Sequence, residues 1–197
     1  MMEYINNNLF KATIFIFGLL LLLVPVLFFA RRDRRMLKPY FDTLKALSIH
    51  FSGAISKPKT LFYDSPTFTG SFDGNKFSLM YYRPEGQPPN ALHLKLHRKS
   101  TNSMRIFAHN IPSKVLFDKA VLTHDPELDR YNFYSSNPDE AKKYLVSHKD
   151  IIKRLPESGW SIPSIDRRSI TVSANVNHII NAEEISKALK IMKELKA

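Results

Sequence analysis

The chain has 197 residues, with 29 Lys and Arg against 18 Asp and Glu, and a formal net charge of +11. It contains no cysteine, which excludes disulfides, thiolate metal sites and cysteine nucleophiles and fits a reducing compartment. Residues 39–197 carry 23 basic and 16 acidic residues, so the excess positive charge extends through the chain and suits an acidic partner. No recognised nucleic-acid-binding motif is present, so nucleic acid is not an expected partner.

Residues 12–30 form an uncharged, mostly apolar run, ATIFIFGLLLLLVPVLFFA. A helix of this length spans about 28 Å, close to the hydrocarbon thickness of a bilayer. The alternative is a cleaved signal peptide, which needs a positive leader, a shorter apolar core and a small-residue cleavage site. The only charged residues in the segment 1–11 are Glu3 and Lys11, so the leader is not positive. Phe28-Phe29-Ala30 matches a cleavage site poorly. We therefore predict an uncleaved transmembrane anchor, preceded by a short extramembrane segment at 1–11.

A basic cluster follows the apolar run directly and sets the expected topology. Lys11 is the one basic residue before the run. The cluster after it consists of Arg31, Arg32, Arg34, Arg35 and Lys38. The positive-inside rule then predicts a single-pass protein of the inner membrane, with the N-terminus outside and the C-terminal domain in the cytoplasm. The cluster either only determines topology or also binds anionic lipid headgroups.

Residues 31–53 are expected to form a basic juxtamembrane segment and a linking helix over 36–52. Pro39 suits a first helical turn, and Gly53 suits the position after a helix end. The apolar face of this helix either lies on the bilayer or packs on the domain, and packing is favoured because only Lys38 and Lys45 in it are basic. Residues 55–59 are expected to be a linker.

Residues 60–197 are expected to form one soluble α+β domain. Asp73-Gly74-Asn75 predicts a hairpin turn, and residues 91–97 alternate strictly between apolar and polar side chains. Strands are expected over 67–72, 76–83, 91–97, 104–109, 115–117, 121–123, 130–135 and 169–176. The fold class is therefore α+β, with a transmembrane helix followed by a mostly antiparallel sheet packed with C-terminal helices.

Three helices are expected in the C-terminal third. Asn137 followed by Pro138, with Glu140 three residues after the cap, predicts a helix start, and Asn181 with Glu184 predicts another. A helix between them is expected to be capped by Ser147 and to end near residue 156. The turn at 158–160 holds Trp160, the single tryptophan, as an expected core residue.

Three segments, at residues 70–77, 125–131 and 137–141, carry a resemblance. They read GSFDGNKF, DPELDRY and NPDEA. With them the chain resembles a loose group of uncharacterised, single-pass, membrane-anchored bacterial proteins with a D-P-E-[FL]-D motif in an α+β domain. The resemblance implies an anchored α+β module and brings no activity with it.

Asp125, Glu127 and Asp129 form a candidate polar site. In an extended segment these carboxylates would share one face and could bind a divalent cation. They could equally form a turn around Pro126 with Arg130 as a charge partner. The EF-hand pattern is absent, and the structural role is favoured, so no metal is expected.

Two further groups of polar residues, histidines in a predicted strand and lysines in the last predicted helix, are candidate sites. His93 and His97 have a spacing that chelates metal on a helix, but in a strand they stand about 13 Å apart, so a solvated strand face is expected. A set of lysines repeats every three residues on the last helix, where it is either a solvated face or a surface for an acidic partner. This set consists of Lys187, Lys190, Lys193 and Lys196.

No catalytic motif accompanies these features: a nucleophile elbow, a P-loop and a dinucleotide fingerprint are all missing. No cofactor is expected. The favoured hypothesis is a membrane-anchored, non-enzymatic accessory or scaffold subunit that presents a cytoplasmic α+β interaction domain. Its expected partners are the bilayer and other subunits of a membrane complex. The alternative is a membrane-proximal enzyme or ligand-binding domain with a dispersed polar site.

Overall fold

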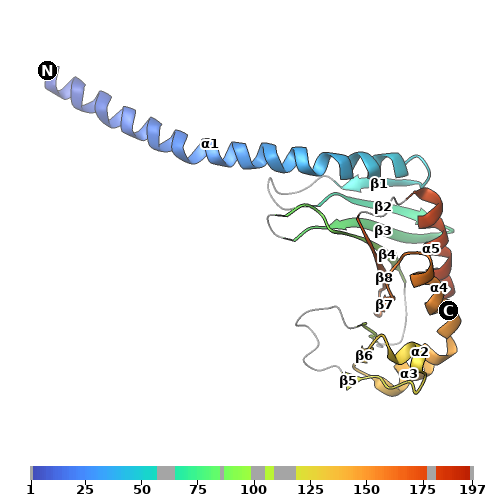
Figure 1. Ribbon diagram of the computed structural model, residues 1–197. Helices are drawn as coiled ribbons and strands as arrows, with labels where there is room; N and C mark the ends of the chain where they lie inside the picture. The colour runs from blue at the N-terminus through green and yellow to red at the C-terminus, as the bar shows by residue number, and fades with distance from the viewer. Residues whose placement is uncertain are drawn as a thin grey trace.

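The computed structural model describes residues 2–56, 65–84, 87–98, 105–108, 119–176 and 181–195. Its first element, α1 (Met2–Leu47), is a helix of 46 residues that projects far from the rest of the molecule (Figure 1). Every residue from Thr13 to Phe29 is exposed apart from half-buried Gly18. Within the part of the chain that the structure describes, α1 is the one helix long and apolar enough to cross a membrane.

The helix does not break after the apolar run. Pro25 and Pro39 both lie inside α1. The predicted separate helix over 36–52 is therefore wrong at both ends: it does not start near Pro39, and it stops at Leu47. Gly53, expected just after a helix end, instead opens strand β1 (Gly53–Ser56), so the linker expected at 55–59 is a strand at its first residues. Packing of Leu44 and Leu47 in the core accounts for the continuity, because tertiary burial outweighs the one hydrogen bond that Pro39 cannot make.

Six strands form one antiparallel sheet in the order β1-β2-β3-β4-β8-β7. The central strands are β2 (Thr67–Phe72), β3 (Asn75–Tyr82), β4 (Ala91–His97) and β8 (Ser169–Asn175), close to the predicted ranges. The edge strand β7 (Ser164–Ile165) was not predicted. Asp73 and Gly74 join β2 to β3 with φ of 47° and 73°, which is the two-residue hairpin that the sequence predicts.

One face of the sheet is apolar and covered. The register places Phe68, Leu79, Leu94 and Val172 side by side across four strands, and all four are fully buried. The last turns of α1 cover this face near β3, where the ring centroids of Tyr40 and Tyr81 lie 4.8 Å apart. The two glycines that pair across β1 and β2, Gly53 and Gly70, leave room for the ring of Phe68, because a Cβ on either would lie within 3 Å of it.

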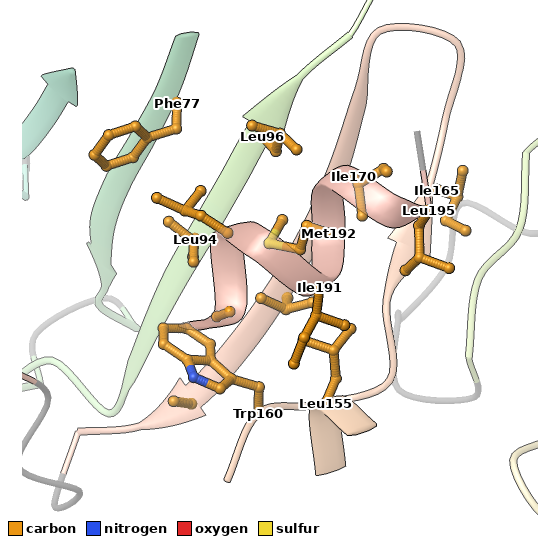
Figure 2. Packing of buried hydrophobic residues seen from close by; sticks show 14 of the residues in the cluster. Phe77, Leu94, Leu96, Leu155, Trp160, Ile165, Ile170, Ile191, Met192 and Leu195 are labelled. Carbon is orange, nitrogen blue, oxygen red and sulfur yellow. The ribbon is translucent and has the colours of Figure 1, made fainter. Parts of the chain in front are cut away.

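Helix α5 (Ala182–Glu194) covers the rest of the apolar face, and α4 (Lys149–Glu157) packs against α5. Figure 2 shows Met192 and Ile191 of α5 between the sheet residue Leu94 and Leu155 of α4. Trp160 is 3% exposed in the same cluster, which confirms its predicted place in the core. The α+β fold class is thus confirmed: a long apolar helix, an antiparallel sheet and C-terminal helices.

A smaller lobe lies beyond the β7 edge (Figure 1). It contains β5 (Lys119–Ala120), α2 (Pro126–Asp129), β6 (Tyr134–Ser135) and α3 (Pro138–Ser147). The strand predicted over 121–123 is wrong, and only the last two residues of the one predicted over 130–135 are strand. Of the strand predicted at 104–109, Ile106 and Phe107 form single bridges to Ile165 and Tyr134. Residues 115–117 lie outside the described residues.

The predicted helix caps at Asn137 and Asn181 are confirmed, and the one at Ser147 is wrong. The Asn137 side chain accepts a hydrogen bond from the backbone N–H of Glu140, and that of Asn181 from the backbone N–H of Glu184. Ser147, however, ends α3 instead of capping α4, whose N-cap is His148, and the His148 side chain makes no capping hydrogen bond to α4. The two helices follow each other so closely that no residue remains for a separate capping turn.

Candidate functional site

The junction between α1 and the sheet is the first candidate site. The four arginines of the predicted basic cluster, Arg31, Arg32, Arg34 and Arg35, are exposed, and so is Lys38. Asp33 lies in the middle of the cluster, but its side chain contacts the domain. Its two carboxylate oxygens accept hydrogen bonds of 2.8 and 3.2 Å from the guanidinium of Arg83, which follows β3. The sequence offers no signal for this pair, because its members are 50 residues apart.

The Asp33–Arg83 pair is largely withdrawn from water. The side chains of Arg83 and Asp33 are 4% and 18% exposed. The Nε of Arg83 also donates to the carbonyl of Gln87 at 2.6 Å, so the guanidinium bridges α1 and the segment after β3. Ala30, the last residue of the apolar run, is itself 6% exposed. The domain therefore contacts α1 from the very end of the apolar run onward.

The acidic residues at 125–129 do not form a shared site. Pro126–Asp129 is a short helix, so the extended arrangement with three carboxylates on one face is wrong. Asp125 caps this helix by accepting from the backbone N–H of Glu127 at 3.0 Å. Asp129 accepts instead from the hydroxyl and the backbone N–H of Thr123, at 2.7 and 2.9 Å.

Lysines of α4 neutralise the other two carboxylates. Lys149 forms ion pairs with both Asp125 and Glu127, the latter at 2.7 Å, and Lys153 pairs with Glu127. Hydrogen bonding to Lys149 holds the pKa of Asp125 and of Glu127 below the ordinary range, and the same contacts raise the pKa of Lys149. The cluster thus links α2 to α4. The predicted charge partner Arg130 is not used, since its guanidinium lies over the Tyr131 ring, 4.6 Å from the centroid.

The two histidines of β4 lie on one face of a strand, as predicted. His97 Nε2 is 3.4 Å from the hydroxyl oxygen of Ser78 on β3. Burial lowers the pKa of His93, and burial with the nearby charges of Lys95 and Lys76 lowers that of His97. Among the described residues, no three His, Asp or Glu side chains gather closely enough to hold a metal ion.

The lysine set on α5 is only partly a free face. Lys187 and Lys190 are exposed, whereas Lys193 donates to the Asp73 carboxylate in the β2–β3 turn at 3.2 Å. Lys196 lies outside the described residues. An open hollow of about 450 Å³ includes Lys187 and Glu184 of α5 and residues 156–159. None of its lining residues belongs to the acidic cluster or to the histidines, so the hollow does not assemble the predicted polar site.

A second candidate surface, which we call the polar sheet face, lies opposite the covered face. The alternation in residues 91–97 pointed to its central strand, but its extent depends on the register of β2, β3 and β8. Its side chains are half-buried or exposed, and none is a carboxylate. They are Thr67, Thr69, Ser78, Met80, Tyr82, His93, Lys95, His97, Thr171 and Ser173.

The chemistry of this face suits binding more than catalysis. Met80 and Tyr82 are 38% and 48% exposed, and the Tyr82 ring lies beside His93 with centroids 5.2 Å apart. Lys95 supplies a positive charge in a row with Ser78 and Thr171. Hydroxyls, an amine and aromatic rings on one face of a sheet can contact a partner over a wide area.

Comparison of the sequence with models of known protein families and with curated proteins finds no match. The resemblance carried by residues 70–77, 125–131 and 137–141 therefore stays a prediction. Among solved structures, the fold is similar to the crystal structure of the mycobacterial trehalose monomycolate transport factor A, TtfA. The TM-score is 0.52 and the identity 14%, over 85% of this chain and 92% of that chain. At this identity the likeness establishes that the two chains share a fold.

Proposed function

We propose that this protein is a non-enzymatic accessory subunit of a membrane assembly, anchored by α1 in the inner membrane with its domain in the cytoplasm. The observation that carries the proposal is the unbroken helix between the apolar run and the domain. A flexible linker is enough for a tether that only confines a domain to the membrane. Here the anchor and the domain share one helix, which fixes the direction in which the domain faces.

The packing at the junction supports a positioning role. Tyr40, Leu44 and Leu47 on the last turns of α1 join the same core as the sheet. The Asp33–Arg83 pair adds a polar contact at the other end of that packed stretch. Together they hold α1 against the sheet over about 21 Å of helix. The polar sheet face is thereby presented at a constant distance from the bilayer.

The fold neighbour supports an accessory role of this kind. TtfA is named as a transport factor, and a comparable part in a membrane transport assembly fits an anchored domain with a broad polar face. The acidic residues of the candidate enzyme site are occupied by Lys149, Lys153 and Thr123. We therefore propose protein subunits as the partners of this domain.

Site-specific crosslinking of the full chain in cells tests the proposal. A photoreactive phenylalanine analogue at Tyr82 or Met80 is expected to form a defined adduct with another membrane-complex subunit. The same analogue at Val146 or Leu122, exposed apolar residues outside the polar sheet face, serves as the matched control. Purification in mild detergent is expected to recover the crosslinked subunit stoichiometrically.

A solitary monomer in detergent with equal, diffuse crosslinking from all four positions would contradict the accessory role. An adduct from Val146 and Leu122 alone would contradict the polar sheet face as the interface, since it would place the partner on the smaller lobe. Reporters fused to each terminus measure the topology. A C-terminus outside the cytoplasm would contradict the cytoplasmic placement of the domain.

A further inference from the structure

We propose that Arg31, Arg34, Arg35 and Lys38 form a binding face for the headgroups of anionic phospholipids, which we call the basic helix face. This inference concerns the anchor and does not depend on the accessory role proposed for the domain. It rests on three observations: the arrangement of these residues around α1, the pairing of Asp33 with the domain, and their distance from the apolar run.

The four cations lie on one side of the helix. At about 100° per residue they fall within an arc of about 100°. All four are exposed. On the opposite side lie the residues that contact the domain, including half-buried Asp33 and buried Leu44. The sheet therefore covers one side of α1 and leaves the basic side open.

Asp33 would weaken an anion site if its carboxylate were free, because it lies between two pairs of arginines. The guanidinium of Arg83 instead holds both of its oxygens, and the Asp33 side chain is only 18% exposed. The one carboxylate of residues 30–38 is thus neutralised by the domain itself. Folding of the domain onto α1 therefore neutralises the negative charge nearest to the basic helix face.

The position along the helix selects a lipid as the occupant. Ala30 ends the apolar run, and Arg31 to Lys38 extend about 12 Å beyond it. The headgroup layer is about 5 to 8 Å thick on each side of the hydrocarbon core, and long basic side chains reach back toward it. Asp42 and Lys45 are exposed one to two turns further on, about 18 Å or more from Ala30, and lie beyond this layer.

Lipid retention by the full chain tests the proposal. The protein is placed in mixed micelles of phosphatidylcholine and phosphatidylglycerol, and bound lipids are counted by native mass spectrometry. The wild type is expected to retain phosphatidylglycerol preferentially. Each basic residue near the surface contributes about five-fold to association at low salt. Contributions of neighbouring charges add only in part, so the variant R31Q/R34Q/R35Q/K38Q is expected to lose about ten-fold or more of that preference.

Two control variants separate charge from geometry. R167Q/R168Q/K187Q/K190Q removes four exposed cations from the domain and is expected to keep the preference. R31K/R34K/R35K keeps the charge and is expected to keep most of the preference. Each variant is expected to retain its helix content, because the substituted side chains are all exposed. Circular dichroism checks this.

The proposal is overturned if the wild type and R31Q/R34Q/R35Q/K38Q retain phosphatidylglycerol equally. It is also overturned if neither shows a lipid preference while the variant loses a co-purified acidic subunit, because the face would then bind protein. Crosslinking from Tyr82 is read separately, so failure of the lipid proposal and failure of the accessory role are distinguishable.

Discussion

The two halves of α1 have the same secondary structure and opposite surroundings. From Thr13 to Phe29 the helix is exposed apart from Gly18 and mostly apolar on all sides, which suits the interior of a bilayer. From Ala30 to Leu47 it is amphipathic: Leu44 and Leu47 are buried against the sheet, and arginines and lysines occupy the other side. The change from an exposed apolar helix to an amphipathic one occurs at Ala30, with no break in the helix. A single helix can therefore serve as both an anchor and a structural element of the domain.

The largest expected effect comes from truncating the packed half. Leu44→Ala removes a fully buried side chain from the core shared by α1 and the sheet. We expect the free energy of unfolding to fall by about 2 to 5 kcal/mol. Denaturant titration of the full chain in mild detergent measures it, with the fluorescence of buried Trp160 as the probe. A loss below about 1 kcal/mol would contradict the packing of the second half of α1 in the core of the domain.

The second effect comes from breaking the Asp33–Arg83 pair. Arg83→Gln leaves a mostly buried carboxylate without its cation. We expect a loss of about 2 kcal/mol, between the roughly 0–1 of surface pairs and the 3–5 of buried ones. In the double variant D33N/R83Q both charges are absent, so it is expected to be less destabilised than the sum of the two single variants. Additive losses, measured by the same titration, would show that the pair does not couple α1 to the sheet.

The third effect is smaller and depends on pH. Lys149→Gln removes the contact that contributes most to lowering the pKa of Asp125 and of Glu127. A lowered folded-state pKa stabilises the protein above the unfolded-state pKa, and this contribution is lost as pH falls through the folded-state value. Wild type is therefore expected to be more stable than the variant at pH 7, and the difference to disappear as pH falls below about 4. Acid titrations of both proteins, followed by Trp160 fluorescence, measure it. A constant difference from pH 7 to pH 3 would contradict this assignment.

The smallest effect is expected in the exposed half. Leu21→Ala removes a side chain that is 61% exposed and lies outside the buried core. We expect the free energy of unfolding of the domain to change by no more than about 0.5 kcal/mol. The same titration checks this, and a larger loss would indicate that the span packs on the domain or on a second copy.

Local sequence patterns determined much of this protein. Nineteen uncharged residues predict the span, the positive φ of Asp73 and Gly74 is what an Asp-Gly hairpin requires, and strict alternation predicts β4 with its correct ends. Asn137 and Asn181 cap their helices as predicted. These features involve residues a few positions apart, so their energies act within one segment and can be recognised there.

Tertiary structure decided the features that combine distant segments. The continuation of α1 through Pro39 depends on burial of Leu44 and Leu47 against strands far along the chain. Asp33 reads locally as one acid among arginines, and only the placement of Arg83, 50 residues later, gives its carboxylate a cationic partner in the domain. The polar sheet face likewise needs the register of four strands. Such contacts form only when the chain folds, because their stabilisation depends on burial and low dielectric that no single segment provides.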